Sequence, residues 1–210
     1  MSAYISVKTL AEYSEVIEKS RFTARCFPCA SYAEAEERLA ALRKEEYDAT
    51  HHCYAGIFGS KGGERRCSDG GEPSGTAGVP ILDAVSGAGL TNVFVVVTRW
   101  FGGVKLGTGG LSRAYRGVAA EAVARAGRTE YMLARELALS FDYGAYTGFQ
   151  RMIRQFKSKV LSTVFADGVK VTVLVAEREV SAFRDALREL TLGRAKVSEG
   201  DADYRGLDAD

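Results

Sequence analysis

Apolar residues in the first 127 positions recur at intervals typical of alternating strands and helices. Apolar, β-branched runs between turn residues predict the strands, and apolar residues three or four positions apart predict the helices. Ser31 and Glu34 form a capping box that opens one of these helices. The predicted elements are strand Ser20–Pro28, a helix from Ser31 to about Glu46, strand Thr50–Phe58, loop Ser60–Gly78, helix Pro80–Ala88, strand Asn92–Thr98 and a helix from about Gly110 to Gly127.

The pattern restarts near Ala134 and predicts a second, smaller set of elements. The dipeptide Asp167-Gly168 between two apolar runs is a strong signal for a hairpin turn. The acidic end of the chain after Glu199 predicts a frayed tail. The predicted elements are strand Leu137–Phe141, helix Tyr146–Phe156, strands Val160–Ala166 and Val169–Val175, helix Val180–Leu190 and a short last strand Ala195–Val197.

Together the two sets of elements predict an α+β protein of two domains. The second set follows the order β-α-β-β-α-β, which is the ferredoxin-like arrangement. A complete arrangement of this kind is expected to fold as a unit of its own. The expected domains are residues 1–130 and residues 134–200.

Composition narrows the classes of function. With 46% apolar and 26% charged residues, the chain is typical of a globular protein. Its formal charge of +1 provides no general attraction to nucleic acid or membranes, so a site for a polyanion must be a local patch. No apolar run approaches the ~20 residues of a membrane span, and the N-terminus lacks the apolar region of a signal peptide. We expect a cytoplasmic protein without a membrane partner.

The cysteines of the first third of the chain raise the question of a metal site. Cys26 and Cys29 form a C-x-x-C pair, and the run His51-His52-Cys53 follows, which suggests zinc ligands. However, the C-x-x-C pair ends a predicted strand, where residues three apart point to opposite faces. The second half of the suggested site also lacks a paired ligand motif. The sequence therefore favours reduced cysteines, with no metal and no cofactor.

The segment Arg99–Arg113 lies between an apolar strand and an amphipathic helix, and it carries five glycines, three cations and no acid. Glycine lets the backbone approach another group closely, and a helix start offers unpaired N–H groups and a partial positive charge. These features predict a cradle for an anion, and the alternative is a tight turn with solvated basic side chains. The candidate anion-binding residues are Arg99, Gly102, Gly103, Lys105, Gly107, Gly109, Gly110 and Arg113.

A second candidate loop, Ser68–Gly78, combines carboxylates and hydroxyls with glycines. Asp69 and Glu72 could coordinate Mg²⁺ or act as a base, and Ser74 and Thr76 could bind a phosphate oxygen. The alternative is a turn held by hydrogen bonds from these side chains to the backbone, which is their common use beside glycine. We expect this loop to pack against the glycine-rich segment, so that both form one surface site.

Two adjacent histidines and several basic residues complete the candidate chemistry. His51 and His52 point to opposite faces of their strand, and structural histidines are favoured over a catalytic base. Basic residues on two helices could meet the phosphates of a nucleic acid, and the alternative is a solvated face. The candidate nucleic-acid-binding residues are Arg116, Arg151, Arg154 and Lys157.

Three segments together closely resemble the IMPACT family in its bacterial YigZ-like branch. These segments are Ala49–Tyr54, Ser68–Leu82 and Val96–Tyr115. The resemblance spans about residues 11–127, and Glu18–Phe22 fits the opening strand of the family. Gly70 stands where an acidic or polar residue is frequent in the family, and Trp100 where tyrosine is frequent.

The resemblance implies a first domain like the second domain of a small-subunit ribosomal protein. It also implies a ferredoxin-like second domain similar to the last domain of elongation factor G. Eukaryotic members dampen the nutrient-stress kinase of translation initiation by competing for its ribosome-bound activator. They use an additional N-terminal domain that has no counterpart in these 210 residues, so this regulatory role is not carried over directly.

These observations favour a cytoplasmic protein of translation regulation or stress response that binds RNA or the ribosome without catalysis. The expected partners are the ribosome, RNA or translation factors. The alternative is an enzyme or sensor that binds a phosphorylated small molecule or nucleotide. In that case the expected working residues are Asp69, Glu72, Arg99 and Lys105.

Overall fold

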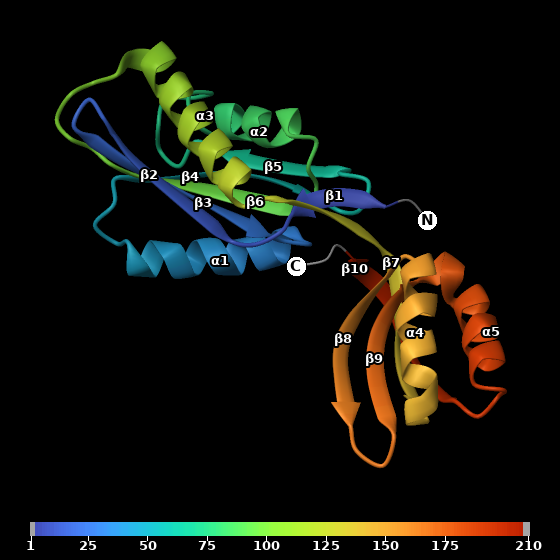
Figure 1. Cartoon of the computed structure of the whole chain (residues 1–210). Coiled ribbons are helices and arrows are strands. Elements are labelled where there is room, and N and C mark those ends of the chain that lie inside the picture. The colour runs from blue at the N-terminus through green and yellow to red at the C-terminus, as the bar shows by residue number, and fades with distance from the viewer. Residues whose placement is uncertain (1–2, 208–210) are drawn as a thin grey trace. The chain divides into compact units, whose positions relative to one another are not determined.

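The structure is a computed structural model that describes residues 3–207 of the chain. The chain divides into two compact units, one over Tyr4–Thr129 and one that contains the chain from Glu130 onward (Figure 1). Each unit has its own sheet, helices and apolar core. The two-domain α+β architecture is therefore confirmed. Separate folding of residues 1–130 and 134–200 stays a prediction.

The N-terminal unit is built on an antiparallel sheet with helices on both faces (Figure 1). The strand order is β2-β3-β6-β4-β5. Helix α1 packs on one face, and helices α2 and α3 pack together on the other. The elements are β1 (Tyr4–Val7), β2 (Ala11–Ile17), β3 (Ser20–Pro28), α1 (Tyr32–Glu45), β4 (His51–Phe58), β5 (Glu64–Ser68), α2 (Gly78–Gly87), β6 (Val93–Trp100) and α3 (Gly107–Arg125).

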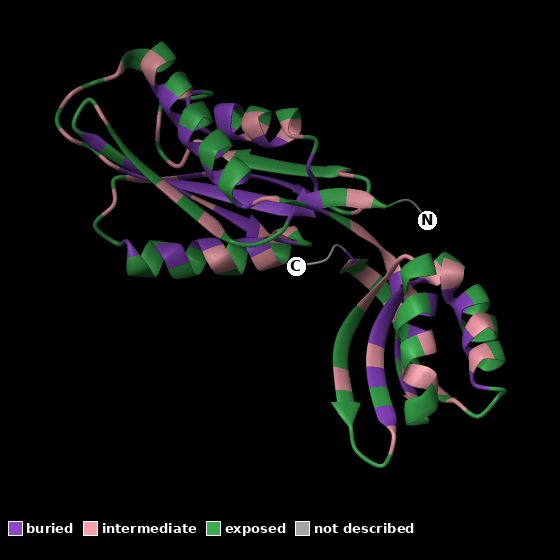
Figure 2. Ribbon diagram, viewed as in Figure 1, coloured by how far each residue is buried: buried purple, intermediate pink, exposed green. Residues whose placement is uncertain are grey.

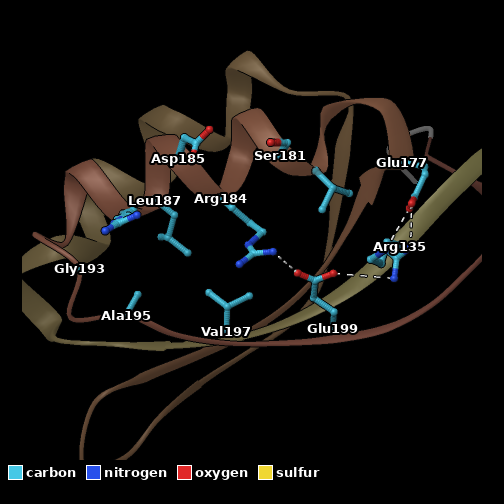
Figure 3. Close-up of a pocket in the computed structure, with 12 residues that line it drawn as sticks. Arg135, Glu177, Ser181, Arg184, Asp185, Leu187, Gly193, Ala195, Val197 and Glu199 are labelled. Carbon is cyan, nitrogen blue, oxygen red and sulfur yellow. Dashed lines mark hydrogen bonds and ion pairs between the residues drawn. The ribbon is translucent and has the colours of Figure 1, made fainter.

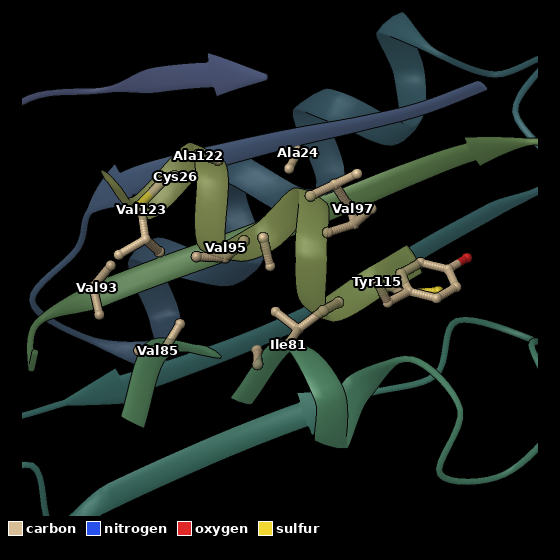
Figure 4. Close-up of a cluster of buried hydrophobic side chains, with 14 of the residues drawn as sticks. Ala24, Cys26, Ile81, Val85, Val93, Val95, Val97, Tyr115, Ala122 and Val123 are labelled. Carbon is tan, nitrogen blue, oxygen red and sulfur yellow. The ribbon is translucent and has the colours of Figure 1, made fainter. Parts of the chain in front are cut away.

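Strand β6 is central, and the helices on both faces explain why its apolar residues form an unbroken run. Val95 and Val97 pack among the side chains of α2 and α3, as Figure 4 shows. Phe94 and Val96 point the other way and pack against α1, because successive side chains of a strand alternate between faces. Figure 2 shows the strand as buried along nearly its whole length. The C-terminal end of β6, which includes Arg99, therefore leads from the core to the two candidate loops.

The C-terminal unit has the ferredoxin-like topology that the order of its elements predicted. Its strands follow the order β10-β7-β9-β8, and all neighbours are antiparallel. The two helices pack on one face of this sheet, where Phe149 of α4 and Phe183 of α5 lie in one core with Leu137 and Val173 (Figure 1). The elements are β7 (Arg128–Phe141), α4 (Tyr146–Met152), β8 (Ser158–Phe165), β9 (Val169–Ala176), α5 (Val180–Leu190) and β10 (Lys196–Gly206), with single 3₁₀ turns at Tyr143–Ala145, Ile153–Gln155 and Glu177–Glu179.

Several elements differ from the prediction. Strands β1 and β2 were not predicted, and β7 begins at Arg128 rather than at Leu137. Strand β5 lies inside the expected loop Ser60–Gly78, because its polar, exposed residues carry no apolar alternation. The expected frayed tail after Glu199 is wrong, because the main chain continues to pair with β7 although most side chains of β10 are exposed. Helix α3 begins at Gly107 rather than near Gly110, because glycines in its first turn hide the helical pattern.

The search for membrane-spanning helices gave a negative result. Among residues 3–207, no helix is both long enough and apolar enough to cross a bilayer.

Candidate functional site

A buried ion pair joins the end of β6 to the loop that follows β5. Nη1 of Arg99 lies 2.6 Å from Oε1 of Glu72, and the two side chains are only 5% and 4% exposed. The hydroxyl of Tyr115, on α3, donates to the same Glu72 oxygen over 2.7 Å. Nη2 of Arg99 donates to the hydroxyl of Ser20 over 3.1 Å. The carboxylate of Glu72 therefore connects three elements that are distant in sequence.

His51 lies beside this ion pair, and His52 lies on the opposite face of β4. Nε2 of His51 is 3.8 Å from Oε2 of Glu72, and its Nδ1 is 3.0 Å from the carbonyl oxygen of Gly70. Nε2 of His52 is instead 3.8 Å from Oε2 of Glu46, at the end of α1. Burial lowers the pKa of His52 and outweighs the neighbouring Glu46, which acts to raise it. The predicted opposite orientation of the two histidines is confirmed.

Sequence reasoning missed the second buried carboxylate, Glu46. It accepts hydrogen bonds from Nη1 of Arg25 over 2.6 Å and from the hydroxyl of Thr98 over 2.7 Å. Polar residues inside otherwise apolar strands could have indicated this network, because a buried hydroxyl or guanidinium needs a partner. Thr98 and Arg99 are adjacent on β6. Thr98 donates to Glu46 on one face of the sheet, and Arg99 donates to Glu72 on the other.

Asp69 holds the turn of the Ser68–Gly78 loop through backbone hydrogen bonds. Its carboxylate accepts from the backbone N–H groups of Gly75 over 2.9 Å, Ala77 over 2.9 Å and Gly78 over 2.8 Å. Partial burial raises the pKa of Asp69, but these three bonds outweigh it and hold that pKa below its usual value. The alternative of a turn held by side-chain to backbone bonds accounts for this carboxylate.

The two hydroxyls of the same loop differ in their surroundings. The hydroxyl of Thr76 donates to the carbonyl of Pro73 over 2.6 Å, and Thr76 is only 3% exposed. Ser74 is exposed at the surface of the loop. A phosphate could therefore reach Ser74 without any rearrangement, whereas Thr76 is already engaged within the turn.

Two glycines of the candidate loops allow close approach of backbone segments. A Cβ on Gly102 would lie 1.9 Å from the carbonyl oxygen of Lys19, so the segment after β6 passes directly against the β2–β3 hairpin. Gly70 has a φ of +56°, and its Cβ would lie 2.2 Å from the carbonyl oxygen of His52. A side chain at this position cannot be placed without moving β4.

Lys105 and Arg113 lie at a separate hollow beside the start of α3. This hollow has a volume of about 510 Å³, and Glu15 and Glu18 of the β2–β3 hairpin also line it. The first turn of α3, which contains Gly107, Gly109 and Gly110, has neither a side-chain cap nor an acidic residue. The lining residues of the hollow do not include Glu72 or its partners, so the expected single site is divided between two places. Ligand binding at either place stays a prediction. Gly103 precedes α3, in the segment after β6.

The four candidate nucleic-acid-binding cations fall into two groups. Arg116 pairs with Asp83 over 2.5 Å, and Lys157 lies 3.7 Å from Glu130. Arg151 and Arg154 are exposed on and just after α4. Neither of these two has a carboxylate within 4.0 Å in the described part of the chain. Arg151 and Arg154 are thus the more available pair for an anionic partner.

The C-terminal unit contains a further hollow, of about 920 Å³, between α5 and β10 (Figure 3). Its walls are charged, and four of the six charged lining residues pair with one another. Nη2 of Arg135 lies 2.7 Å from Glu177, and Nη1 of Arg184 lies 2.6 Å from Glu199. Sequence reasoning did not single out these residues, because each pair joins positions at least 15 apart on different elements. The other two charged residues, Asp185 and Arg188, have opposite charges, so the hollow offers little net charge to a ligand.

The buried cysteines lack the thiolate character that metal binding or redox chemistry requires. Burial raises the pKa of Cys26, Cys29 and Cys53 to about 12 in each case, so these thiols are neutral at physiological pH. Cys26 packs with α2 and α3, whereas Cys29 packs with α1, which confirms their opposite orientation. No three His, Cys, Asp or Glu side chains among residues 3–207 are grouped to hold a metal ion.

We expect one thiol per chain to react with a thiol-specific reagent in the native protein. Cys67 is exposed on β5, whereas the other three cysteines are buried and their pKa values are about 12. Colorimetric titration should therefore count one fast thiol in the native state and four after denaturation. A Cys67→Ser variant should lose the fast reaction. Fast reaction of two or more native thiols would contradict the burial described here.

Each of the two units matches a known family model. The model of the Impact N-terminal domain matches residues 18–123, which include the buried ion pair and both candidate loops. A second model, described as a domain of unknown function (DUF1949), matches residues 139–194 within the ferredoxin-like unit.

Relatives extend this similarity over nearly the whole chain. IMPACT family member YvyE of Bacillus subtilis is 35% identical over 97% of this chain and 94% of its own length. IMPACT family member YigZ of Escherichia coli is 32% identical, over 87% of this chain and 91% of its own length. A crystal structure of a hypothetical protein covers 94% of this chain and 97% of its own, with a TM-score of 0.64 and 29% identity. The chain belongs to the IMPACT family.

Proposed function

We propose that this protein acts in the cytoplasm as a non-catalytic regulator of translation that binds RNA of the ribosome. The observation that carries the proposal is the start of α3. There Lys105 and Arg113 are exposed beside a helix N-terminus that has neither a side-chain cap nor an acid in its first turn. Unpaired backbone N–H groups, a positive helix end and two cations together favour a phosphate group.

A second group of cations supports a ligand with many phosphates rather than one. Arg151 and Arg154 are exposed on the C-terminal unit and have no carboxylate within 4.0 Å in the described residues. A nucleic acid gains affinity from each cation that neutralises a phosphate, because counterions are released. The chain as a whole carries a charge of only +1, so these local groups would provide the attraction.

The state of the candidate catalytic groups favours binding over catalysis. Oε1 of Glu72 already accepts bonds from Arg99 and Tyr115, and Asp69 accepts three backbone bonds. A general base must be free to take a proton from a substrate, and each of these carboxylates is instead engaged within the protein. We therefore infer that both carboxylates shape the loops that present the phosphate-binding surface.

A second candidate function, a sensor or enzyme for a phosphorylated small molecule, has one observation in its favour. The hollow at Lys105 and Arg113 measures about 510 Å³. Ligand pockets commonly measure roughly 300–1,000 Å³, so a nucleotide would fit by size. Glu15 and Glu18 in its lining would oppose a nucleotide and an RNA phosphate alike. This function is the weaker candidate because it leaves the second cationic group, Arg151 and Arg154, without a role.

The test measures binding to ribosomal RNA as a function of salt concentration. Replacing both Lys105 and Arg113 with alanine should lower the slope of log affinity against log salt by about two units, one for each lost phosphate contact. The Arg151→Ala, Arg154→Ala double variant should lower it by a similar amount. Arg125→Ala is the matched control, since Arg125 lies on the same helix but pairs with Glu121 over 3.0 Å. Sedimentation with ribosomes provides an independent readout.

Two outcomes would decide against RNA binding. In the first, all three variants bind ribosomal RNA as the parent does, so that neither cationic group contacts the phosphates. In the second, ATP or GTP raises the melting temperature of the parent and not of the Lys105→Ala, Arg113→Ala variant, while RNA binding is absent. That result would support the small-molecule function.

A further inference from the structure

The outer strand of the C-terminal sheet, β8, is unusually apolar for an edge strand. It pairs with β9 and, among the described residues, with no other strand, so one edge of its backbone is left without a partner strand. Most of the strand is exposed (Figure 2). Its exposed large apolar residues are Val160 at 43%, Leu161 at 47%, Val164 at 54% and Phe165 at 55%. Exposed apolar edge strands are sites where another strand adds to a sheet.

The exposed apolar residues lie on both faces of β8. Phe165 is in register with Val169, whose side chain belongs to the core beneath the helices. Val164 is in register with Lys170 and therefore points to the helix-free face. Apolar residues on both faces are typical of a strand whose two faces are both covered. Strand β8 has this composition at the edge of its sheet, where its large apolar residues are exposed instead.

The opposite edge of the same sheet provides a contrast within one domain. Strand β10 carries the charged residues Lys196, Glu199, Asp201, Asp203 and Arg205, and its register shifts between Glu199 and Ala202. Charges and bulges are the usual means by which proteins keep an edge from pairing with another chain. Strand β8 also has a register shift, between Val160 and Ser162, but Lys159 is its only charged residue.

We propose that β8 pairs antiparallel with β8 of a second copy of this chain and joins two C-terminal sheets into one. A second copy suits this strand because its apolar surface is complementary to itself and needs no opposite charge. Antiparallel pairing also places the two copies of Lys159 at opposite ends of the interface, since Lys159 lies near the start of β8. Tyr143 is 54% exposed and stacks on Phe165 with ring centroids 6.2 Å apart, which enlarges the apolar surface.

Analytical ultracentrifugation of the full chain over a wide range of concentration tests this proposal. The parent should form a species of twice the 22.7 kDa chain mass as concentration rises. Val164→Lys should raise the dissociation constant at least about tenfold, because it removes an apolar contact and adds two like charges to the interface. Tyr47→Lys is the control, because Tyr47 is 85% exposed in the N-terminal unit and should not affect assembly.

Two further measurements keep the result interpretable. Thermal unfolding of the diluted Val164→Lys variant should match that of the diluted parent, since the replaced side chain is half exposed. Hydrogen exchange should slow in residues 158–165 of the parent as concentration rises, and in no other strand edge. A parent that stays monomeric at every concentration overturns the proposal. A dimer that resists Val164→Lys and leaves the exchange of β8 unchanged also overturns it.

Discussion

Replacing Glu72 with glutamine should lower the free energy of unfolding by about 3–5 kcal/mol, the usual result of removing one partner of a buried ion pair. The substitution keeps the size and shape of the side chain and removes its charge. Arg99 would then remain buried, with its side chain 5% exposed and no carboxylate bonded to it. The Nε atom of Arg99 already lacks a hydrogen-bond partner, so few other bonds would remain to stabilise the buried guanidinium. Denaturation by urea, followed by circular dichroism, measures the change.

The matched control is the exposed ion pair between Arg116 and Asp83. The side chains of this pair are 58% and 51% exposed, so Asp83→Asn should change the free energy of unfolding by at most about 1 kcal/mol. A double variant with Glu72→Leu and Arg99→Met should recover much of the loss, because it leaves no unpaired charge behind. Equal effects of Glu72→Gln and Asp83→Asn would show that the buried pair does not stabilise the fold as described.

The elements predicted well from the sequence are those whose pattern of apolar and polar residues matches which side chains are buried. Strand β6 shows an unbroken apolar run because helices cover both of its faces. The hairpin at Asp167-Gly168 was predictable because this dipeptide suits the turn itself. Strand β5, and the part of β10 beyond the expected strand Ala195–Val197, were hidden for the opposite reason. They are held by main-chain bonds at sheet edges, and most of their side chains face solvent and carry no periodic signal.

The sequence predicted which residues belong to the candidate site, but it did not predict which of them contact one another. Glu72 and Arg99 were both singled out, yet they are 27 positions apart and no local spacing joins them. Their contact follows from the register of the sheet, which sets His51 opposite Arg99 and brings the loop after β5 alongside. Tyr115 reaches the same carboxylate from α3. A sequence pattern reports which face a residue occupies, and only the fold decides which residues share that face.

Replacing Asp69 with asparagine should lower the free energy of unfolding by about 2–3 kcal/mol at neutral pH, since hydrogen bonds to a charged group are worth roughly this much. An amide has one oxygen where the carboxylate has two. If that oxygen faces the N–H groups of Ala77 and Gly78, the amide N–H₂ meets the N–H of Gly75 and one bond is lost. Asp185→Asn, on the exposed surface of α5, is the control and should change stability by at most about 0.5 kcal/mol.

The effect of Asp69→Asn should depend on pH in a direction that the hydrogen bonds determine. The folded state holds the pKa of Asp69 below its usual value, so the carboxylate binds its proton less readily in the folded chain than in the unfolded one. Its contribution to stability is therefore complete above the unfolded pKa of about 3.9 and is lost as pH falls through the folded value. Urea denaturation of parent and variant at several pH values should show curves that are well separated at pH 7 and converge in acid. Parallel curves across the whole acid range would mean that the three backbone bonds are made equally well to a neutral side chain, and that the charge of Asp69 does not hold the loop.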